Sequence, residues 1–193
     1  MKKSFPIMTA VFTAGILTAP VYAASPYLSS NFGAWYSNSG LATSTNEIVA
    51  GLNVIGAIGM TIDNYRLEAE LGNQFIIDPV KTNVVGISNS FSAKTFLVNG
   101  YYYIEGNGLN PYFTAGAGPT WIDTDIYINS NKYSAKYTAL GYQLGGGAVI
   151  PVSDHFAIDA RYRYFATSTI NDNTNENNKI QTHSVFVGFR YEF

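Results

Sequence analysis

Charged side chains recur at every second position in three short stretches of the sequence. Side chains two residues apart lie on one face of a β-strand, whereas a helix would spread them around its surface. The set holds four arginines and four carboxylates, so its charges cancel. Buried charges of opposite sign must pair, because an unpaired one is costly. We therefore predict a structural ion-pair network inside a β-structure, formed by Arg66, Glu68, Glu70, Asp159, Arg161, Arg163, Arg190 and Glu192.

The sequence offers little for catalysis. A nucleophile and its base must share one face, but His183 and Ser184 are adjacent and therefore point to opposite faces of a strand. His155 falls in a predicted turn, where no cleft is expected. The chain has no cysteine and shows no metal-ligand spacing or phosphate-binding loop, since the glycines at 145–147 lie within a strand pattern. We predict no enzymatic activity, metal site or cofactor.

The C-terminal stretch His183–Phe193 contains two of these charged residues and indicates what kind of strand they belong to. One of its faces is wholly apolar, while the other mixes Gly188 with Arg190 and Glu192. Neither a soluble core nor ordinary solvent exposure suits both faces, whereas a strand with lipid outside and a polar lumen inside does. The closing strand of a soluble β-sandwich is the alternative. The apolar face consists of Val185, Val187, Phe189, Tyr191 and Phe193.

Seven further segments follow the strand period of two. In most of them apolar residues alternate with polar or small ones, and inward glycines leave room for bulky neighbours in a narrow barrel. The segment 91–105 is apolar on both sides, so its faces stay unassigned. The eight predicted strands are 27–36, 47–60, 65–78, 91–105, 111–125, 135–152, 156–166 and 183–193.

The connections between these segments alternate in length. Long polar loops follow most of the odd-numbered segments, at 37–46, at 79–90 and, the longest, at 167–181, and short turns follow the even-numbered ones. The polar residues at 129–133 also predict a turn. In an outer-membrane barrel the short turns face the periplasm and the long loops face outward. Both termini then lie on the periplasmic side, which requires an even number of strands. We predict an all-β fold, an eight-stranded antiparallel transmembrane up-and-down β-barrel.

The N-terminus has the pattern of a secretory signal peptide. Two lysines precede an apolar run from Phe5 to Ala19, which is too short to span a bilayer as a stable helix. Small residues then lead to Ala23, and we predict cleavage after it, leaving a barrel domain at 24–193. A retained membrane anchor is the alternative. A lipoprotein anchor is excluded, because no cysteine follows the cleavage point.

The composition agrees with a membrane-embedded sheet. The chain has 15 Tyr, 12 Phe and 18 Gly but only 12% charged residues, and aromatic residues form girdles at the membrane interfaces of barrels. The net charge of −2 gives no basic surface for nucleic acid. A carbohydrate-binding platform is the alternative use of the aromatic residues. Those predicted to form girdles are Trp35, Tyr36, Trp121, Tyr142, Tyr162, Tyr164, Tyr191 and Phe193.

Several motifs, in this order, resemble one family over nearly the whole chain after residue 23. They include RLEAELG at 66–72, NPYFTAGAG at 110–118, AIDARYRY at 157–164 and VGFRYEF at 187–193. The chain resembles the small outer-membrane β-barrels of Gram-negative bacteria, which include opacity-type and OmpA/OmpX-type surface proteins. The resemblance implies contact with outer-membrane lipid. It also implies that the C-terminal strand is recognised by the barrel insertion machinery, with help from periplasmic chaperones.

The same resemblance implies a role at the cell surface. We predict a structural surface protein, antigen or adhesin-like module that meets a host or cell-surface ligand through its long loops. An eight-stranded barrel is only just wide enough for its own side chains, so the balanced charges predict a closed lumen, whereas a lining of one sign would favour a selective pore. Two alternatives remain, a small pore for ions or solutes and a lipid-modifying enzyme. Deacylases among similar barrels need His and Ser two residues apart, unlike His183 and Ser184.

Overall fold

The computed structural model describes residues 24–37, 49–76, 80–81, 87–104, 106, 108–128, 131–169 and 179–193. The predicted signal peptide at 1–23 lies outside the described residues, as do most residues of the predicted loops at 37–46 and 167–181. No helix in the described part is long and apolar enough to cross a membrane. The strands are β1 (Ala24–Ser37), β2 (Val49–Ile62), β3 (Tyr65–Ile76), β4 (Val80–Lys81), β5 (Ile87–Tyr103), β6 (Asn110–Ile128), β7 (Asn131–Pro151), β8 (Phe156–Thr167) and β9 (Gln181–Glu192).

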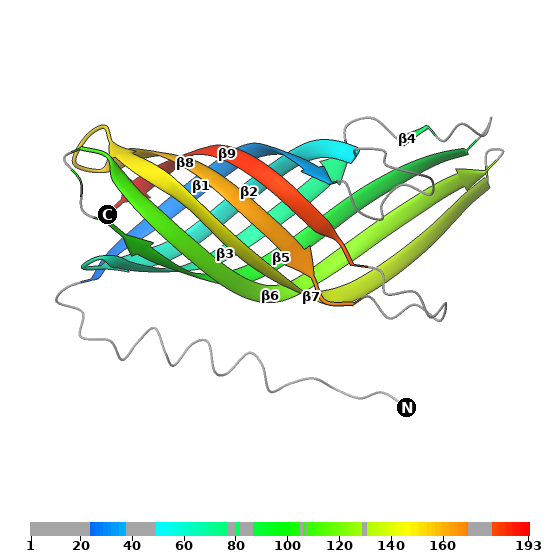
Figure 1. Cartoon of the computed structure of the whole chain (residues 1–193), viewed down its shortest axis with the longest axis horizontal. Helices are drawn as coiled ribbons and strands as arrows, with labels where there is room; N and C mark the ends of the chain where they lie inside the picture. Colours follow the sequence, from blue (N-terminus) through cyan, green and yellow to red (C-terminus); the bar gives the residue numbers. More distant parts are fainter. Residues whose placement is uncertain are drawn as a thin grey trace, which may run out of the picture.

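Eight of the described strands form a closed antiparallel barrel (Figure 1). Apart from β3 and β4, strands that follow one another along the chain are paired, and β1 pairs with β9. The ring is completed by β3 and β5, which pair directly. The remaining strand, β4, has two residues and pairs with β5 beyond the point where β3 ends. The eight-stranded up-and-down barrel predicted from the sequence is confirmed.

The two ends of the barrel differ. Ala24 and Phe193 lie at one end, together with the short connections that follow β2, β5 and β7, and we name it the terminal end. There the Phe193 N–H donates to the Pro26 carbonyl at 3.0 Å, beside the β1–β9 seam. At the opposite end, named the loop end, β5, β6 and β7 extend beyond the other strands (Figure 1).

This extension is longer than predicted. The polar composition at 129–133 suggested a turn, but β6 runs to Ile128 and β7 begins at Asn131, and these two residues are paired. The predicted loop at 79–90 likewise contains β4 and the start of β5. Cross-strand contacts between polar side chains explain why the hairpin continues where its composition predicts a turn, because such pairs stabilise a sheet exposed to water.

Asp125 supports this hairpin in its ionised form. Ser134 Oγ donates to Asp125 Oδ1 at 2.7 Å, and Lys132 Nζ lies 3.0 Å from Asp125 Oδ2. These contacts, the Ser134 hydrogen bond first, hold the pKa of Asp125 below its ordinary value. A carboxylate whose pKa is lowered by folding stabilises the fold above its unfolded-state pKa, and this contribution is lost as the pH falls through the folded-state pKa.

We therefore expect amide hydrogen exchange at the tip of β6 and β7 to become faster below about pH 4, after correction for intrinsic exchange. The measurement is NMR exchange of the barrel in detergent micelles or nanodiscs. Asp125→Asn is the matched control and should abolish the acid-dependent step. An identical pH profile in the two proteins would contradict the assigned role of Asp125.

The two faces of each strand separate as the period of two predicts. In β5, whose faces the sequence left open, Ala93, Leu97 and Tyr101 are at most 3% exposed and point inward, whereas Tyr102 is 46% exposed. The exposed apolar residues form the outer surface predicted to contact lipid. They include Leu28, Phe32, Ile58, Leu67, Leu71, Phe113, Leu140, Leu144, Val185, Val187 and Phe189.

Inward glycines make room for the largest lumenal side chains, as predicted. A Cβ at Gly51 would lie 2.7 Å from Trp35 Nε1, and one at Gly147 would lie 2.7 Å from the Tyr112 hydroxyl. Both distances are shorter than a carbon atom tolerates, so any larger residue would displace the ring beside it.

Aromatic side chains lie on the outer surface near both ends, with one correction. Trp35 was predicted to be a girdle residue but is 2% exposed inside the lumen, where its Nε1 donates to the Leu52 carbonyl at 3.0 Å. Its position in β1 shares the inward face with Asn31, and Gly51 provides the space. The exposed rings are Tyr36, Trp121, Tyr142 and Tyr162 toward the loop end, and Tyr65, Tyr102, Phe156, Tyr191 and Phe193 toward the terminal end.

Candidate functional site

The lumen brings together the charged residues singled out in the sequence. Those of β3 lie across the ring from those of β8, because four strand-to-strand steps separate the two strands in either direction. Seven of the eight residues are at most 8% exposed, while the Glu192 side chain, at the terminal rim, is 32% exposed. Ion pairs between β3 and β8 therefore connect opposite walls of the barrel.

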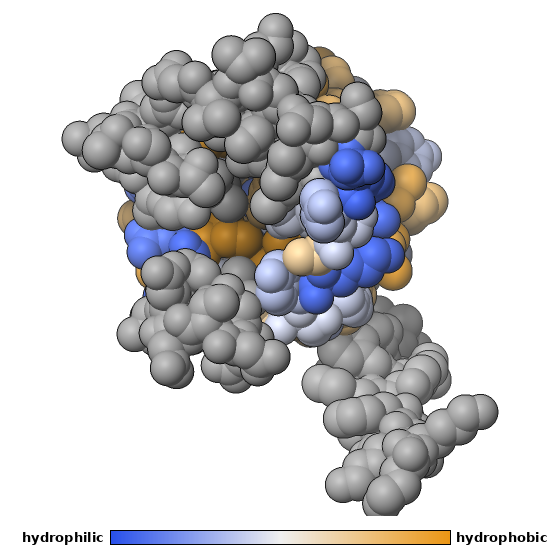
Figure 2. All heavy atoms as spheres, turned by 90° about the vertical axis from the view of Figure 1, so that its right-hand side faces the viewer, coloured by the Kyte–Doolittle hydropathy of each residue, from blue (hydrophilic) through white to orange (hydrophobic). Residues whose placement is uncertain are grey.

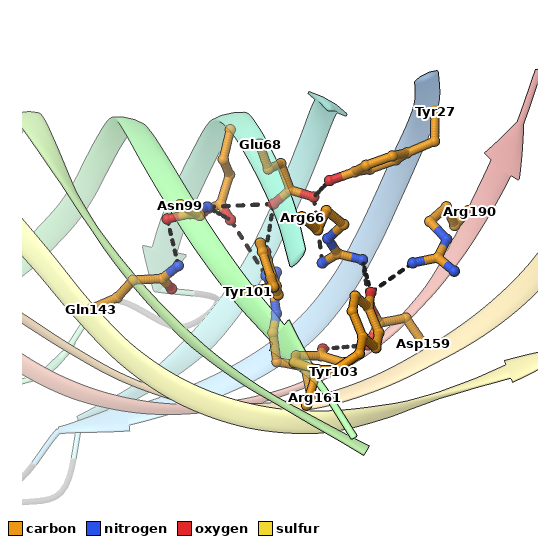
Figure 3. Close-up of polar contacts among 12 residues, drawn as sticks. Tyr27, Arg66, Glu68, Asn99, Tyr101, Tyr103, Gln143, Asp159, Arg161 and Arg190 are labelled. Atoms are coloured by element: carbon orange, nitrogen blue, oxygen red, sulfur yellow. Dashed lines mark hydrogen bonds and ion pairs between the residues drawn. The ribbon is translucent and has the colours of Figure 1, made fainter. Parts of the chain in front are cut away.

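Arg66 occupies the centre of the terminal half of the lumen (Figure 3). Its Nη1 donates to the Tyr103 hydroxyl at 2.6 Å and lies 3.9 Å from Asp159 Oδ2. Its Nη2 lies 3.6 Å from Glu68 Oε2. The guanidinium carbon also lies 3.5 Å from the centroid of the Tyr101 ring. Two carboxylates and a stacked ring compensate for the loss of water around this cation.

Glu68 accepts hydrogen bonds from three side chains besides its ion pair. Tyr27 donates at 2.7 Å, Tyr101 at 2.5 Å and Asn99 Nδ2 at 3.4 Å. Hydroxyl donors of this kind bind an ionised carboxylate more strongly than a neutral acceptor. Glu68 is thereby joined to both β1 and β5.

Glu70 is shared by two arginines of β8. Arg163 Nη1 lies 2.8 Å from Glu70 Oε1, and Arg161 Nη1 lies 3.5 Å from Oε2. Asn99 Nδ2 donates to Oε2 at 3.0 Å, and Gln143 Nε2 donates to Asn99 Oδ1 at 2.6 Å. This part of the network reaches from β3 through β5 to β7 and β8.

The network continues to the terminal rim through Arg190. Its Nη1 donates to the Tyr103 hydroxyl at 2.7 Å, and its Nη2 lies 2.9 Å from Glu192 Oε1. The Tyr103 oxygen therefore accepts from both Arg190 and Arg66. Tyr112 donates to Asp159 Oδ1 at 2.5 Å, which links β6 to β8.

Four tyrosines of the lumen were not predicted as members of this network. Tyr27, Tyr101, Tyr103 and Tyr112 are each at most 9% exposed and bind its charged groups. Tyr112 lies on the face of its strand that the sequence pattern turns inward, and Tyr27 shares the inward face of β1. Strand period could therefore have placed these two, whereas β5 shows no clear face in the sequence and gives no such signal for Tyr101 and Tyr103.

Some buried donors in the described lumen remain without hydrogen-bond partners. They include Nε and Nη2 of both Arg161 and Arg163, and Nε of Arg66 and of Arg190. The guanidinium groups of Arg161 and Arg163 lie over the Phe186 ring, at 5.0 and 4.8 Å from its centroid. Because unpartnered buried donors are destabilising, these two arginines depend strongly on Glu70, the carboxylate that they share.

The loop end of the lumen is apolar instead. Trp35 and Phe91 meet edge to face with ring centroids 5.9 Å apart. Figure 2, which looks at the loop end, shows apolar residues within the mouth and hydrophilic residues along part of its rim. The cluster consists of Trp35, Val49, Phe91, Ala93, Ile122, Ala139 and Ile180, each at most 8% exposed.

At the terminal end a pocket of about 190 Å³ opens beneath the network. Arg190 and Tyr103 are buried residues of its lining, which also includes Asp63 and Asn64 of the turn between β2 and β3. Asp63 has a φ of 50°, a turn conformation that Asp and Asn tolerate better than most residues.

Neither histidine is part of the lumenal network. Ser184 is buried, and its Oγ accepts from Asn53 Nδ2 at 3.1 Å, whereas His183 faces outward, stacks on Tyr36 at 5.1 Å and shares a hydrogen bond with Tyr162. The two side chains thus lie on opposite faces, as predicted. His155 stacks on Tyr191 at 5.9 Å. Among the described residues no group of three His, Cys, Asp or Glu side chains could hold a metal ion.

These features define a class of protein: a transmembrane barrel with an apolar outer surface, aromatic rings near both ends and a lumen occupied by its own side chains. Residues 9–193 match the model of the outer membrane protein beta-barrel domain, and the chain belongs to this family. The resemblance to outer-membrane barrels and the outer-membrane location predicted from the sequence are confirmed.

Outer membrane protein PagN of Salmonella typhimurium is 32% identical over 115 residues, which cover 54% of this chain and 46% of PagN. The match thus spans about half the length of that curated relative. Neisserial surface protein A superposes with a TM-score of 0.67 at 17% identity, covering 89% of this chain and 99% of that one. The attachment invasion locus protein Ail of Yersinia pestis gives 0.55 at 16% identity, with the same coverage. At these identities the two structures show the fold alone.

Proposed function

We propose that this protein is a surface-exposed outer-membrane barrel that contacts partners outside the cell through its loop end, and that its lumen is closed to solutes. The observation that carries the proposal is the projection of β5, β6 and β7 beyond the other strands at the loop end (Figure 1). In this region β6 continues past Trp121, whose ring is exposed, to Ile128. Polar pairs such as Asp125 with Lys132 continue there, where a lipid-facing surface would be apolar. A projecting hydrated sheet suits binding better than anchoring.

The proposed orientation places the terminal end in the periplasm. The short connections at this end and the projection at the other match the asymmetry of outer-membrane barrels. We also propose that residues 1–23 are a signal peptide removed on export, because two lysines, an apolar run and small residues precede the proposed cleavage point after Ala23.

Relatives support a surface role in a general way. Ail is named for attachment and invasion, and it has also been solved with the heparin analogue sucrose octasulfate. We propose an adhesin-like or antigenic role for this chain, structural in the membrane and binding through its loop end. A catalytic role on lipid is disfavoured, because His183 and Ser184 lie on opposite faces of β9. Mass spectrometry of lipid A from expressing cells should show no gain or loss of acyl chains.

Surface exposure of the projecting hairpin is tested by inserting a protease site between Asn129 and Ser130, with a matched insertion after Asp154 in a turn at the terminal end. In intact cells we expect cleavage of the first protein alone, and in permeabilised cells cleavage of both. Protection of the hairpin site in intact cells, with cleavage at Asp154, would reverse the orientation and overturn the proposed function.

The closed lumen predicts an absence of discrete conductance. The cross-lumen ion pairs of Glu70 with Arg161 and Arg163 and the apolar cluster around Trp35 together support closure. Purified protein in planar bilayers should therefore give no stepwise current. The small pore is the second candidate function, favoured by the unpartnered donors of Arg161 and Arg163. Reproducible steps that change in Glu68→Ala and Arg161→Ala would establish it instead.

A further inference from the structure

The pocket at the terminal end lies apart from the surface proposed to contact partners. Three parts of the chain line it: the turn between β2 and β3, the residues that flank the connection between β5 and β6, and Arg190 of β9. Figure 1 shows these short connections at the end of the barrel that also holds Ala24 and Phe193. The pocket is therefore a separate candidate for binding, at the end opposite the projecting sheet.

Two opposite charges line this pocket. Arg190 is buried, whereas Asp63 is an exposed residue of the turn between β2 and β3. Arg190 pairs with Glu192, and no ion pair joins it to Asp63 within the described part of the chain. The Asp63 carboxylate has no hydrogen bond or ion pair with any other described residue. Both a cationic and an anionic group are thus available to a ligand that enters from the aqueous side.

Arg190 can still donate hydrogen bonds to a ligand. A guanidinium group carries five N–H donors. In Arg190, Nη1 donates to the Tyr103 hydroxyl at 2.7 Å (Figure 3), and Nη2 lies 2.9 Å from Glu192 Oε1. Nε has no partner, and neither does Oγ1 of Thr61, a second lining residue. Because buried polar groups without partners are destabilising, a carboxylate that accepts from Arg190 and Thr61 would stabilise this side of the pocket.

The charges of the lining disfavour simple ions. A lone carboxylate near Arg190 would be repelled by Asp63, and a simple ammonium ion would be repelled by Arg190. A zwitterion can place its carboxylate beside Arg190 and its ammonium group beside Asp63. The side chains of Asn64 and Asn110 also line the pocket, and an amide can donate to one group or accept from the other. The lining thus favours a ligand that carries both charges.

The volume of the pocket limits the size of its ligand. At about 190 Å³ it is smaller than the sites of about 300–1,000 Å³ that hold drug-sized molecules. Since a water molecule occupies about 30 Å³ in the liquid, the pocket has room for a ligand of about six non-hydrogen atoms. This size matches glycine, β-alanine or γ-aminobutyrate, and a nucleotide or a disaccharide is too large.

We propose that the terminal pocket binds a small aliphatic amino acid as a zwitterion, with its carboxylate toward Arg190 and Thr61 and its ammonium group toward Asp63. The bound ligand connects the turn between β2 and β3 to β9, two parts of the barrel that are not paired with each other. Binding in this pocket does not depend on the adhesin-like role. The proposed orientation decides only that the ligand comes from the periplasm.

The test titrates glycine, β-alanine and γ-aminobutyrate, each alone, into the isotopically labelled barrel in nanodiscs, with amide chemical shifts measured by NMR. At least one should bind saturably with a dissociation constant of about 1–10 mM, a range within reach of so small a ligand, and should move the amide signals of Thr61, Asp63 and Tyr103. Propionate has the size of glycine but no ammonium group, and glycinamide has no carboxylate. Each should bind at least about tenfold more weakly than the zwitterion that binds best.

Asp63→Asn tests the contact with the ammonium group. It removes the charge and keeps a residue type that tolerates the φ of 50° at this position. We expect the zwitterion to bind about three- to fivefold more weakly, as for loss of an exposed ion pair, and propionate to bind more tightly. Asp154→Asn is the matched control, because it removes an exposed aspartate from another turn at the same end that does not line the pocket. It should leave both affinities unchanged.

Three results would overturn the proposal: no saturable shift with any of the three zwitterions up to about 50 mM, propionate binding as tightly as the best zwitterion, or equal effects of Asp63→Asn and Asp154→Asn. The first result means that the pocket takes up only water, and the second means that it accepts anions in general. The third means that Asp63 does not contact the ligand. The proposed function is tested separately, by protease cleavage at the projecting hairpin.

Discussion

Replacing Glu70 with alanine is expected to lower the free energy of unfolding by about 3–5 kcal/mol, the range found when one partner of a buried ion pair is removed. Glu70 is fully buried and is the carboxylate shared by Arg161 and Arg163. Both arginines already have donors without partners, so the variant would leave two cations in the lumen without their common anion. Urea unfolding of the barrel in lipid vesicles, followed by tryptophan fluorescence, measures the change.

Two further variants separate this effect from a general loss of charge. Asp123→Ala removes the ion pair to Lys136 at the surface and should cost less than about 1 kcal/mol, because exposed pairs contribute little. Glu70→Met combined with Arg163→Met should recover part of the loss, since a cation is removed together with its anion. If Glu70→Ala costs no more than Asp123→Ala, water already solvates these charges, and the network is not what stabilises the lumen.

The amino-acid sequence alone could predict which charged residues form this network, but not which of them are in contact. The period of two places Arg66, Glu68 and Glu70 on one face, and the same rule places Arg161 and Arg163. It states that these residues share a lumen, but not which of them meet. That Glu70 serves two arginines, while Arg66 stacks on Tyr101, depends on the stagger of β3 against β8, which follows from closure of the ring.

Strand ends were harder to predict than strand faces. Within the barrel the outer surface must be apolar to contact lipid. Apolar residues therefore recur at every second position in most strands. Beyond Trp121 this requirement ends, and Asn131, Lys132 and Ser134 have the composition of a turn although they form a strand. Cross-strand pairing with Asp125 decides the outcome there, and such a contact between residues nine apart is invisible to local composition.

Deleting Phe193 is expected to reduce the amount of barrel in the outer membrane several-fold while barely changing the stability of barrels that do insert. The reduced amount of inserted barrel is expected from the family resemblance, because Phe193 would end an insertion signal formed with Val185, Val187, Phe189 and Tyr191. The small change in stability is expected from the structure, because Phe193 is 71% exposed and its ring contacts the Tyr191 ring edge to face, with centroids 5.1 Å apart. Losing this contact and the bond to Pro26 should cost only about 1–2 kcal/mol.

Phe156 provides the matched control for this deletion. It is 53% exposed at the same end of the barrel and also contacts Tyr191 edge to face, at 5.0 Å. Phe156→Ala therefore removes a comparable ring contact from the same neighbour without altering the C-terminus. Quantified surface labelling of intact cells should show near-normal levels for Phe156→Ala and strongly reduced levels for the deletion, although urea unfolding gives both proteins similar stability. Equal surface levels would mean that Phe193 acts as an ordinary lipid-facing ring, and that recognition by the insertion machinery depends on other residues of β9.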